Sequence, residues 1–176
     1  MVLETSRLIL RPFTDTDAPD LYASASDRRV GHSAGWEPHK SVEESLEIIH
    51  TVFSTPNTFA VVDKASGRVI GSAGFNDGHQ TMLPGPDDEI GYALHPDYWG
   101  RGLMTEAVRE LLRCGFEELG LAAIWCGHFA DNHRSRRVIE KCGFTYRFTD
   151  RVWVEVVGKE LEELHYALTK EEWKAL

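Results

Sequence analysis

Apolar residues recur along this chain in two patterns, short β-type runs and longer helical runs. The strongest helical pattern covers 103–119, where apolar positions recur at steps of three and four over about four turns. Gly120 follows at the position where a glycine commonly ends a helix. Capping residues and apolar spacing predict further helices over 14–25, 41–53, 132–142 and a short stretch from 169.

Runs rich in branched and aromatic residues predict about seven strands. They cover 7–11, 59–62, 69–75, 89–94, 122–127, 144–157 and 161–168. The turn-forming stretch 64–67 joins the second and third runs, which predicts an antiparallel hairpin. Two prolines and two glycines within 76–87 predict a loop. No repeat or flexible linker interrupts the pattern, so we expect one domain over 1–176.

Composition places the chain among ordinary globular proteins, with 42% hydrophobic and 27% charged residues in 176. The first residues lack the basic start and apolar run of a secretion signal, and no stretch approaches the ~20 apolar residues that span a bilayer. Cys114, Cys126 and Cys142 form no C-x-x-C pair, which favours reduced core thiols over metal ligands. We therefore expect a cytoplasmic protein without a metal and without a membrane partner.

The balance of charge bears on the partners of this chain. Nineteen basic and twenty-eight acidic side chains give a net charge of −9, which opposes binding to nucleic acid phosphates. A cationic substrate fits this sign, although an acidic composition also serves solubility. The sequence leaves the oligomeric state open, a homodimer being one alternative.

A candidate phosphate-binding loop follows the predicted strand 89–94. Gly100 and Gly102 come directly before the predicted helix, and glycines allow an anion to approach the backbone closely. The first N–H groups of a helix have no internal partner and lie at the positive end of its dipole. Two glycines also occur in ordinary tight turns, so the pattern alone is weak. The chain lacks the nucleotide loop G-x-x-x-x-G-K-[ST] and the three-glycine dinucleotide fingerprint, which makes ATP and NAD poor candidates.

Three stretches together resemble the GNAT superfamily of N-acetyltransferases, and its RimJ/RimL branch most closely. They are 89–107 with its W-G-R-G-L-M loop, 132–144 with its N-x-x-S start and E-K-x-G-F end, and 5–12 at the first strand. The resemblance extends over about 5–168. It implies an α+β fold in which helices flank a mixed, splayed central sheet, and it implies acetyl-CoA as co-substrate.

The resemblance also assigns residues to the acetyl-CoA site. The strand edge at 92–94 is expected to pair with the pantetheine arm as an added strand would. The amides of 100–105 are expected to hold the pyrophosphate. Trp99 and Met104 take the first and last places of the family pattern Q/R-x-x-G-x-G/A, and tryptophan is familiar in this branch. The expected cofactor-binding residues are Tyr92, Ala93, Leu94, Trp99, Gly100, Arg101, Gly102, Leu103, Met104, Thr105, Asn132 and Ser135.

Acetyl transfer to an amine requires a neutral amine, a route for its proton and stabilisation of the departing thiolate. In many GNAT enzymes a tyrosine serves as the acid, seven residues after the asparagine that opens the helix corresponding to 132–142. Ile139 stands at that position here. Ser135, in the first turn of the same helix, is the alternative hydrogen-bond donor to the sulfur. It could instead cap the helix start or pack on CoA.

Several groups compete for the role of proton acceptor. Glu89, which opens the cofactor strand, is our candidate, and an ordinary strand-end carboxylate is the alternative. Asp131, Glu155, His128 and water are weaker candidates. A basic cluster on the helix predicted over 132–142 could meet CoA phosphates or form a solvated helix face. It comprises Arg134, Arg136, Arg137 and Lys141.

The sequence therefore predicts an enzyme that moves an acetyl group from acetyl-CoA to a primary amine by direct transfer. The amine is a protein N-terminus or a small molecule, and the first two helices and the late strand loop are expected to form its pocket. The alternative is a GNAT-like module that senses acyl-CoA or another ligand without turnover.

Overall fold

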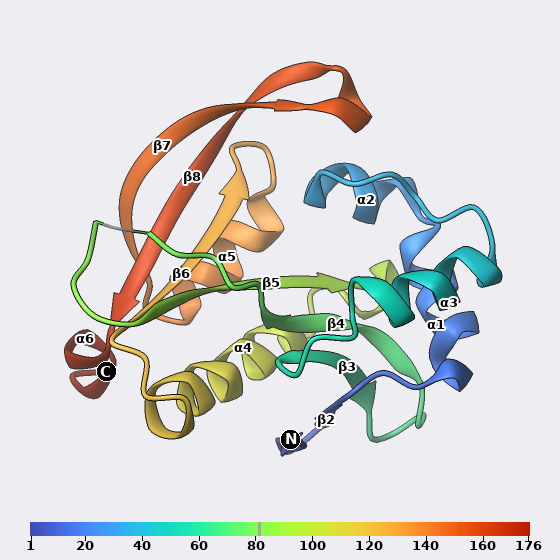
Figure 1. The fold of residues 1–176 in the computed structure, drawn as a ribbon, viewed down its shortest axis with the longest axis horizontal. Helices are drawn as coiled ribbons and strands as arrows, with labels where there is room; N and C mark the ends of the chain where they lie inside the picture. The colour runs from blue at the N-terminus through green and yellow to red at the C-terminus, as the bar shows by residue number, and fades with distance from the viewer. Residues whose placement is uncertain (81) are drawn as a thin grey trace.

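The computed structural model describes residues 1–80 and 82–176 and contains one mixed sheet (Figure 1). The strand order is β1-β2-β3-β4-β5-β6-β8-β7, and every neighbouring pair is antiparallel except β5 and β6. The strands are β1 Leu3–Glu4, β2 Leu8–Arg11, β3 Thr58–Asp63, β4 Val69–Phe75, β5 Asp87–Leu94, β6 Ala123–Phe129, β7 Thr145–Val154 and β8 Lys159–Thr169. Thr81, within the predicted loop 76–87, lies outside the described residues.

The predicted α+β fold with a mixed sheet is confirmed, with eight strands instead of about seven. The additional strand is β1, which pairs Leu3 with Leu10 and is too short to carry a repeating pattern of its own. The predicted hairpin is confirmed as β3 and β4, which pair in antiparallel register from Thr58 opposite Gly74.

Helices begin largely where their capping residues predict. They are α1 Ala18–Ala25, α2 Arg28–Ala34, α3 Val42–Thr51, α4 Leu103–Arg113, α5 His133–Lys141 and α6 Lys170–Lys174. Ser41, Asn132 and Thr169 each accept a hydrogen bond from a backbone N–H in the first turn of α3, α5 and α6. The helix predicted over 14–25 begins with a 3₁₀ turn, Asp15–Asp17, before α1.

The helices differ from the prediction in two places. The helix predicted over 103–119 is α-helical as far as Arg113 and continues as a π-helix, Cys114–Glu118, with the Leu119 N–H donating to the Cys114 carbonyl. Helix α2 was not predicted from the sequence. It is capped by the Asp27 side chain and ends at Gly35, whose φ of 83° suits a glycine.

Helices cover both faces of the sheet, and the alternation along β3 shows how. Phe59 and Val61 belong to the large core that contains α4, whereas Ala60 and Val62 point to the opposite face, toward Phe13. On that side α1 and α3 form a smaller cluster around Leu21 and Ile49. Within the described residues, no helix has the length and the apolar character needed to cross a membrane.

The sheet splits where its two parallel strands meet. β5 and β6 pair only from Asp87 opposite Ala123 to Glu89 opposite Trp125. Beyond Glu89, β5 stays paired with β4, while β6 runs along β8. Figure 1 shows β5 and β6 diverging, with α2 across the gap from β6. The splayed sheet expected from the resemblance is therefore present.

Candidate active site

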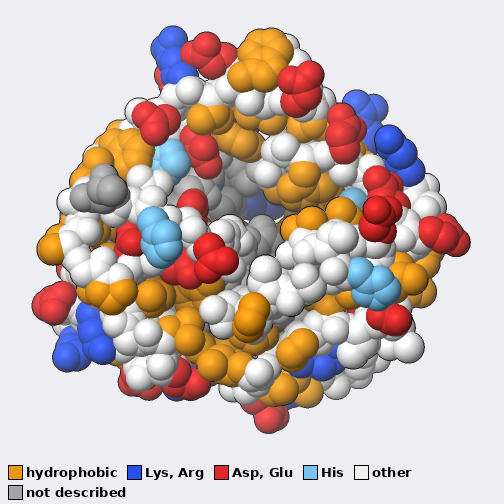
Figure 2. Space-filling view, viewed as in Figure 1, with side chains coloured by type: hydrophobic (Ala, Val, Ile, Leu, Met, Phe, Trp, Pro, Cys, Tyr) orange, Lys and Arg blue, Asp and Glu red, His pale blue; other side chains and the backbone are white. Residues whose placement is uncertain are grey.

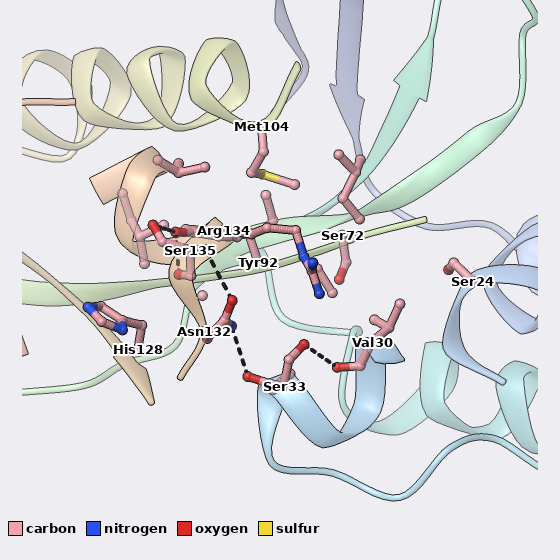
Figure 3. Close-up of a pocket in the computed structure, with 18 of the residues that line it drawn as sticks. Ser24, Val30, Ser33, Ser72, Tyr92, Met104, His128, Asn132, Arg134 and Ser135 are labelled. Atoms are coloured by element: carbon pink, nitrogen blue, oxygen red, sulfur yellow. Dashed lines mark hydrogen bonds between the residues drawn. The ribbon is translucent and has the colours of Figure 1, made fainter. Parts of the chain in front are cut away.

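A cavity of about 850 Å³ occupies the splay of the sheet and reaches the surface. It is lined by β4, β5 and β6, by the starts of α4 and α5, and by residues of α1, α2 and α3 (Figure 3). In Figure 2 the surface is hollowed near the centre, between β6 and α2. Glu89 and all of the expected cofactor-binding residues except Arg101 line this cavity.

Arg101 turns away from the cavity. Its guanidinium donates to the Asp97 carbonyl oxygen over 2.7 Å and lies 5.1 Å from the centre of the Tyr98 ring. The backbone of Arg101 remains part of the glycine loop, but its side chain supports the preceding 3₁₀ turn, Pro96–Tyr98.

The glycine loop has a backbone conformation that requires its glycines. Gly100 and Gly102 have φ values of 74° and 76°, in the left-handed region that other residues rarely adopt. Gly102 is the N-cap of α4, so the N–H groups of residues 103–105 lack acceptors within the helix. Met104 packs into the large core at 5% exposure while lining the cavity, so its bulk leaves these N–H groups accessible.

Trp99 anchors the loop and forms a platform for arginines. Its indole N–H donates to the Leu94 carbonyl oxygen over 2.8 Å. The Arg134 guanidinium stacks 3.9 Å from the ring centre, and that of Arg29 lies at 5.6 Å. This stack between α5 and the loop was not predicted from the sequence, because it joins segments far apart in the chain.

The basic cluster of α5 is divided between the cavity and solvent. Arg134, Arg137 and Lys141 line the cavity. Arg136 does not; its Nε donates to the Glu140 carboxylate over 2.8 Å on an exposed helix face. The first three can face an anion in the cavity, and Arg136 is a solvated surface residue.

Ser135 lies in a short chain of hydrogen bonds at the start of α5. Its hydroxyl oxygen is 2.7 Å from the Tyr92 hydroxyl, and its N–H donates to the Asn132 side chain over 3.2 Å (Figure 3). The Asn132 amide nitrogen in turn donates to the Ser33 carbonyl oxygen of α2 over 3.0 Å. The sequence assigned Tyr92 to the site because of its backbone, at the strand edge expected to pair with the pantetheine arm. In the structure its phenol is an additional polar group of the site.

Glu89 lies at the apex of the splay, where it is the last residue of β5 that pairs with β6. Burial, followed by the nearby charge of Glu163, raises the pKa of Glu89 above its ordinary value, and His165 acts in the opposite sense. The two carboxylates come together over Gly127: an added Cβ there would lie 3.7 Å from Glu89 and 3.2 Å from Glu163. Both carboxylates line the cavity.

The competing proton acceptors lie elsewhere or are engaged. Asp131 and Glu155 do not line the cavity, and Glu155 accepts a hydrogen bond from the Trp153 indole over 2.7 Å. His128 lines the cavity, but its ring nitrogens are 2.7 Å from the Phe129 carbonyl oxygen and 3.3 Å from the Tyr166 hydroxyl. Both ring nitrogens of His128 therefore have partners within the protein.

Glu163 was missed from the sequence. It reaches the site because β8 pairs with β6 in antiparallel register, with Glu163 opposite Phe129. Four carboxylates line the cavity, from Glu37, Glu44, Glu89 and Glu163. Among the described residues, no group of three or more His, Cys, Asp and Glu side chains is arranged to hold a metal ion.

Comparisons with known proteins agree with this geometry. A family model described as acetyltransferase (GNAT) domain matches residues 7–145. The chain is 30% identical over 174 residues to the uncharacterized N-acetyltransferase YoaA of Bacillus subtilis, covering 96% of this chain and 97% of that protein.

Solved structures share the fold over nearly the whole chain. An acetyltransferase of the GNAT family from Bacillus anthracis superposes with a TM-score of 0.84 and 24% identity, covering 97% of this chain and 99% of that one. A ribosomal-protein-S5-alanine acetyltransferase from Vibrio fischeri superposes with a TM-score of 0.74 and 21% identity, covering 98% of both chains.

Proposed function

This chain belongs to the GNAT acetyltransferase family, and we propose that it transfers an acetyl group from acetyl-CoA directly to a primary amine. The proposal treats 1–176 as one acetyltransferase domain. Its relatives are named N-acetyltransferases, and membership of the family implies acetyl-CoA as co-substrate. The choice of amine and the roles of individual residues are the parts that we propose.

A single observation carries the proposal: one cavity contains cationic residues and a helix start on one side of the splay and carboxylates at its apex. Arg134, Arg137, Lys141 and the N-terminus of α4 suit the phosphates of CoA. Glu89 and Glu163 suit an ammonium group. An anionic carrier and a cationic acceptor can therefore enter one cavity and meet between these groups.

The residues present fit acetyl-CoA. The left-handed backbone of Gly100 and Gly102 leaves the loop free of side chains, and the N–H groups of 103–105 are available to a pyrophosphate. The edge of β5 that diverges from β6 after Glu89 offers backbone groups to an amide-bearing arm, as in strand addition. No metal is needed for this chemistry.

Acetyl-CoA supplies a thioester whose acetyl carbon forms the new C–N bond as the C–S bond breaks. For this step the amine must be neutral, and Glu89 is the proposed acceptor of its proton, directly or through water. The Ser135 hydroxyl is the proposed hydrogen-bond donor to the departing sulfur. Because burial raises its pKa, the Glu89 carboxylate is a stronger proton acceptor than an exposed glutamate.

The proposed acceptor is a cationic primary amine, because four carboxylates of the described residues line the cavity. The protein from Vibrio fischeri is named for a ribosomal protein, so a protein N-terminus is included in the proposal beside small amines such as polyamines. The segments that shape the acceptor side are α1, α2 and α3, which precede the glycine loop in the chain. Family motifs give little guidance on these three helices.

The test is release of CoA thiol from acetyl-CoA across a panel of protein N-terminal peptides, polyamines and amino acids. We expect release that depends on one class of amine, with mass spectrometry showing the acetylated product. Tight binding of acetyl-CoA without release by any amine would support the ligand-sensing alternative instead. The absence of both binding and release would refute the acetyl-CoA site itself.

A further inference from the structure

Tyr92 and Ser135 form the closest pair of hydroxyl groups in the candidate site. Their oxygens are 2.7 Å apart, and the Tyr92 oxygen is also 3.3 Å from the Ser135 carbonyl oxygen. Among the described residues, Tyr92 provides the one side-chain hydrogen bond to the Ser135 hydroxyl. Tyr92 comes from β5 and Ser135 from α5, so this contact links the two sides of the splay (Figure 3).

The pair has two arrangements of its hydrogen atoms. In one, Ser135 donates to Tyr92, and Tyr92 donates to the Ser135 carbonyl oxygen over the longer distance. In the other, Tyr92 donates to the Ser135 hydroxyl oxygen, which leaves the serine hydrogen free to point into the cavity. An anion in the cavity favours the second arrangement, and hydrogen bonds in a chain strengthen one another.

The phenol of Tyr92 remains a donor across the working pH range. Burial raises the pKa of Tyr92 well above its ordinary value. Its titratable neighbours are the thiols of Cys126, on β6, and Cys142, after α5. Burial raises the pKa of both thiols, that of Cys142 to about 11, so they stay neutral beside it. Neither cysteine therefore takes the proton of Tyr92, whose phenol remains a hydrogen-bond donor.

We infer that Tyr92 is a positioning residue for acetyl transfer. By donating to the Ser135 oxygen, it turns the serine hydrogen toward the sulfur and makes the hydroxyl a stronger donor to the developing thiolate. No proton is transferred along the pair: the sulfur keeps its negative charge until it is protonated from solvent. The inference rests on the proposed function, because it requires the sulfur to lie near Ser135.

The first experiment compares wild type, Tyr92→Phe, Ser135→Ala and the double variant with acetyl-CoA and an amine that the panel identifies. We expect Tyr92→Phe to lower kcat about tenfold, in line with the loss of one hydrogen bond, that to the Ser135 hydroxyl. The dissociation constant of acetyl-CoA should stay nearly unchanged. The double variant should be no slower than Ser135→Ala, because Tyr92 acts through the serine.

A second measurement does not depend on turnover. The thiol of bound CoA is titrated by its thiolate absorbance in the ultraviolet, with the complex of desulfo-CoA as blank. Wild type should lower the thiol pKa relative to free CoA, and both Tyr92→Phe and Ser135→Ala should return it toward the free value. A change of one pKa unit corresponds to a tenfold change in the acid dissociation constant.

Tyr166→Phe is the matched control, since it removes another buried hydroxyl, one 3.3 Å from His128. It should leave kcat and the thiol pKa at wild-type values. Wild-type kcat in Tyr92→Phe, or multiplicative losses in the double variant, would overturn the inference while leaving the proposed function intact. An inactive wild type that leaves the thiol pKa of bound CoA unchanged would instead remove the proposed function on which the inference rests.

Discussion

Glu89 combines two physical effects that favour a proton acceptor. Burial and the neighbouring charge of Glu163 both raise its pKa, and among the described residues no hydrogen bond holds its carboxylate in the charged form. A group whose folded-state pKa is raised destabilises the fold once the pH rises high enough for it to ionise. The position therefore has a cost in stability that a proton-transfer role would explain.

Glu89→Gln should lower kcat about a hundredfold near neutral pH, because it removes the proton acceptor. The rate should recover in part at high pH, where more of the amine is already neutral. The thermal midpoint should stay at or above that of wild type, since a buried charge is removed. Measurement of kcat against pH, together with thermal unfolding, tests both parts.

Asp131→Asn is the control for this prediction, because Asp131 lies outside the cavity. It should behave as wild type at every pH. A Glu89→Gln variant with wild-type rates over the whole range would leave water or Glu163 as the route for the proton.

Gly102→Val should weaken acetyl-CoA binding at least tenfold. A branched residue is strained at a φ of 76°, so the loop must change its backbone and move the N–H groups that face the pyrophosphate. The fold should survive, because the nearest atom to an added Cβ is the Arg7 guanidinium at 3.7 Å. Calorimetric titration of a variant that is folded by circular dichroism measures the effect.

Gly67→Val offers a matched control for strain. Gly67 has a φ of 70° in the turn between β3 and β4, and nothing lies within 4 Å of an added Cβ. Both valine variants should lose similar stability, but Gly67→Val should bind acetyl-CoA as wild type does. Equal affinities in the two variants would exclude the loop from the site.

Local motifs explain which candidate residues the sequence could reveal. Gly102 and Ser135 lie in short patterns whose spacing is visible in the chain, and the structure brings both to one cavity. Glu163 and the phenol of Tyr92 could not be found in this way. Glu163 depends on the register of β8 with β6, and the phenol depends on how closely α5 approaches β5.

At the level of elements, Glu106 fastens the N-terminal segment to the first turn of α4. Its carboxylate accepts hydrogen bonds from the Thr5 hydroxyl over 2.6 Å, the Ser6 hydroxyl over 3.0 Å, and the Arg7 N–H and Nε over 2.8 and 2.7 Å. These bonds outweigh burial and lower the pKa of Glu106 to about 2. They hold the segment before β2 beside the glycine loop.

Glu106→Gln should lower the free energy of unfolding at pH 7 by about 2 kcal/mol, because hydrogen bonds to a charged group are lost. A carboxyl whose folded-state pKa is lowered stabilises the fold above its unfolded pKa. In wild type this contribution should disappear as the pH falls from the ordinary glutamate range to about 2. Urea unfolding at several pH values measures it.

The exposed Glu47 on α3 supplies the comparison, and Glu47→Gln should change the unfolding free energy little at any pH. If the difference between wild type and Glu106→Gln stayed constant from pH 7 to about 2, the hydrogen-bonded carboxylate would not be its source.

Most elements could be predicted because their signals are local. α4 and α5 have clear apolar spacing or a capping residue, and the strands have branched residues between turns. α2 has a capping residue in Asp27 but no apolar spacing: Val30 is its one buried large apolar residue, and Gly31 weakens it as an isolated helix. It is held by contacts with distant segments, such as the hydrogen bond from Asn132 to Ser33. The π-helix after Arg113 likewise depends on packing within the core.

For the whole molecule, the sheet consists of two parts that share little backbone pairing. β5 and β6 are joined over three residue pairs, and the large core continues across the junction through α4 and α5. A ligand in the splay would contact β5, α4 and α5 together and so connect both parts. Its binding should therefore affect the stability of the entire fold.

Acetyl-CoA should raise the thermal midpoint by about 5–10 °C, because a ligand at a hundredfold excess over its dissociation constant contributes about 2.7 kcal/mol. Hydrogen exchange should slow most at residues 90–94 and 103–105, where the arm and the pyrophosphate are proposed to bind. NAD and ATP carry similar phosphates but have no amide-bearing arm for the edge of β5, so they should protect 90–94 little and stabilise far less. An equal shift with NAD, or protection confined to the start of α4, would mean that the cavity holds a phosphate without recognising the acyl arm.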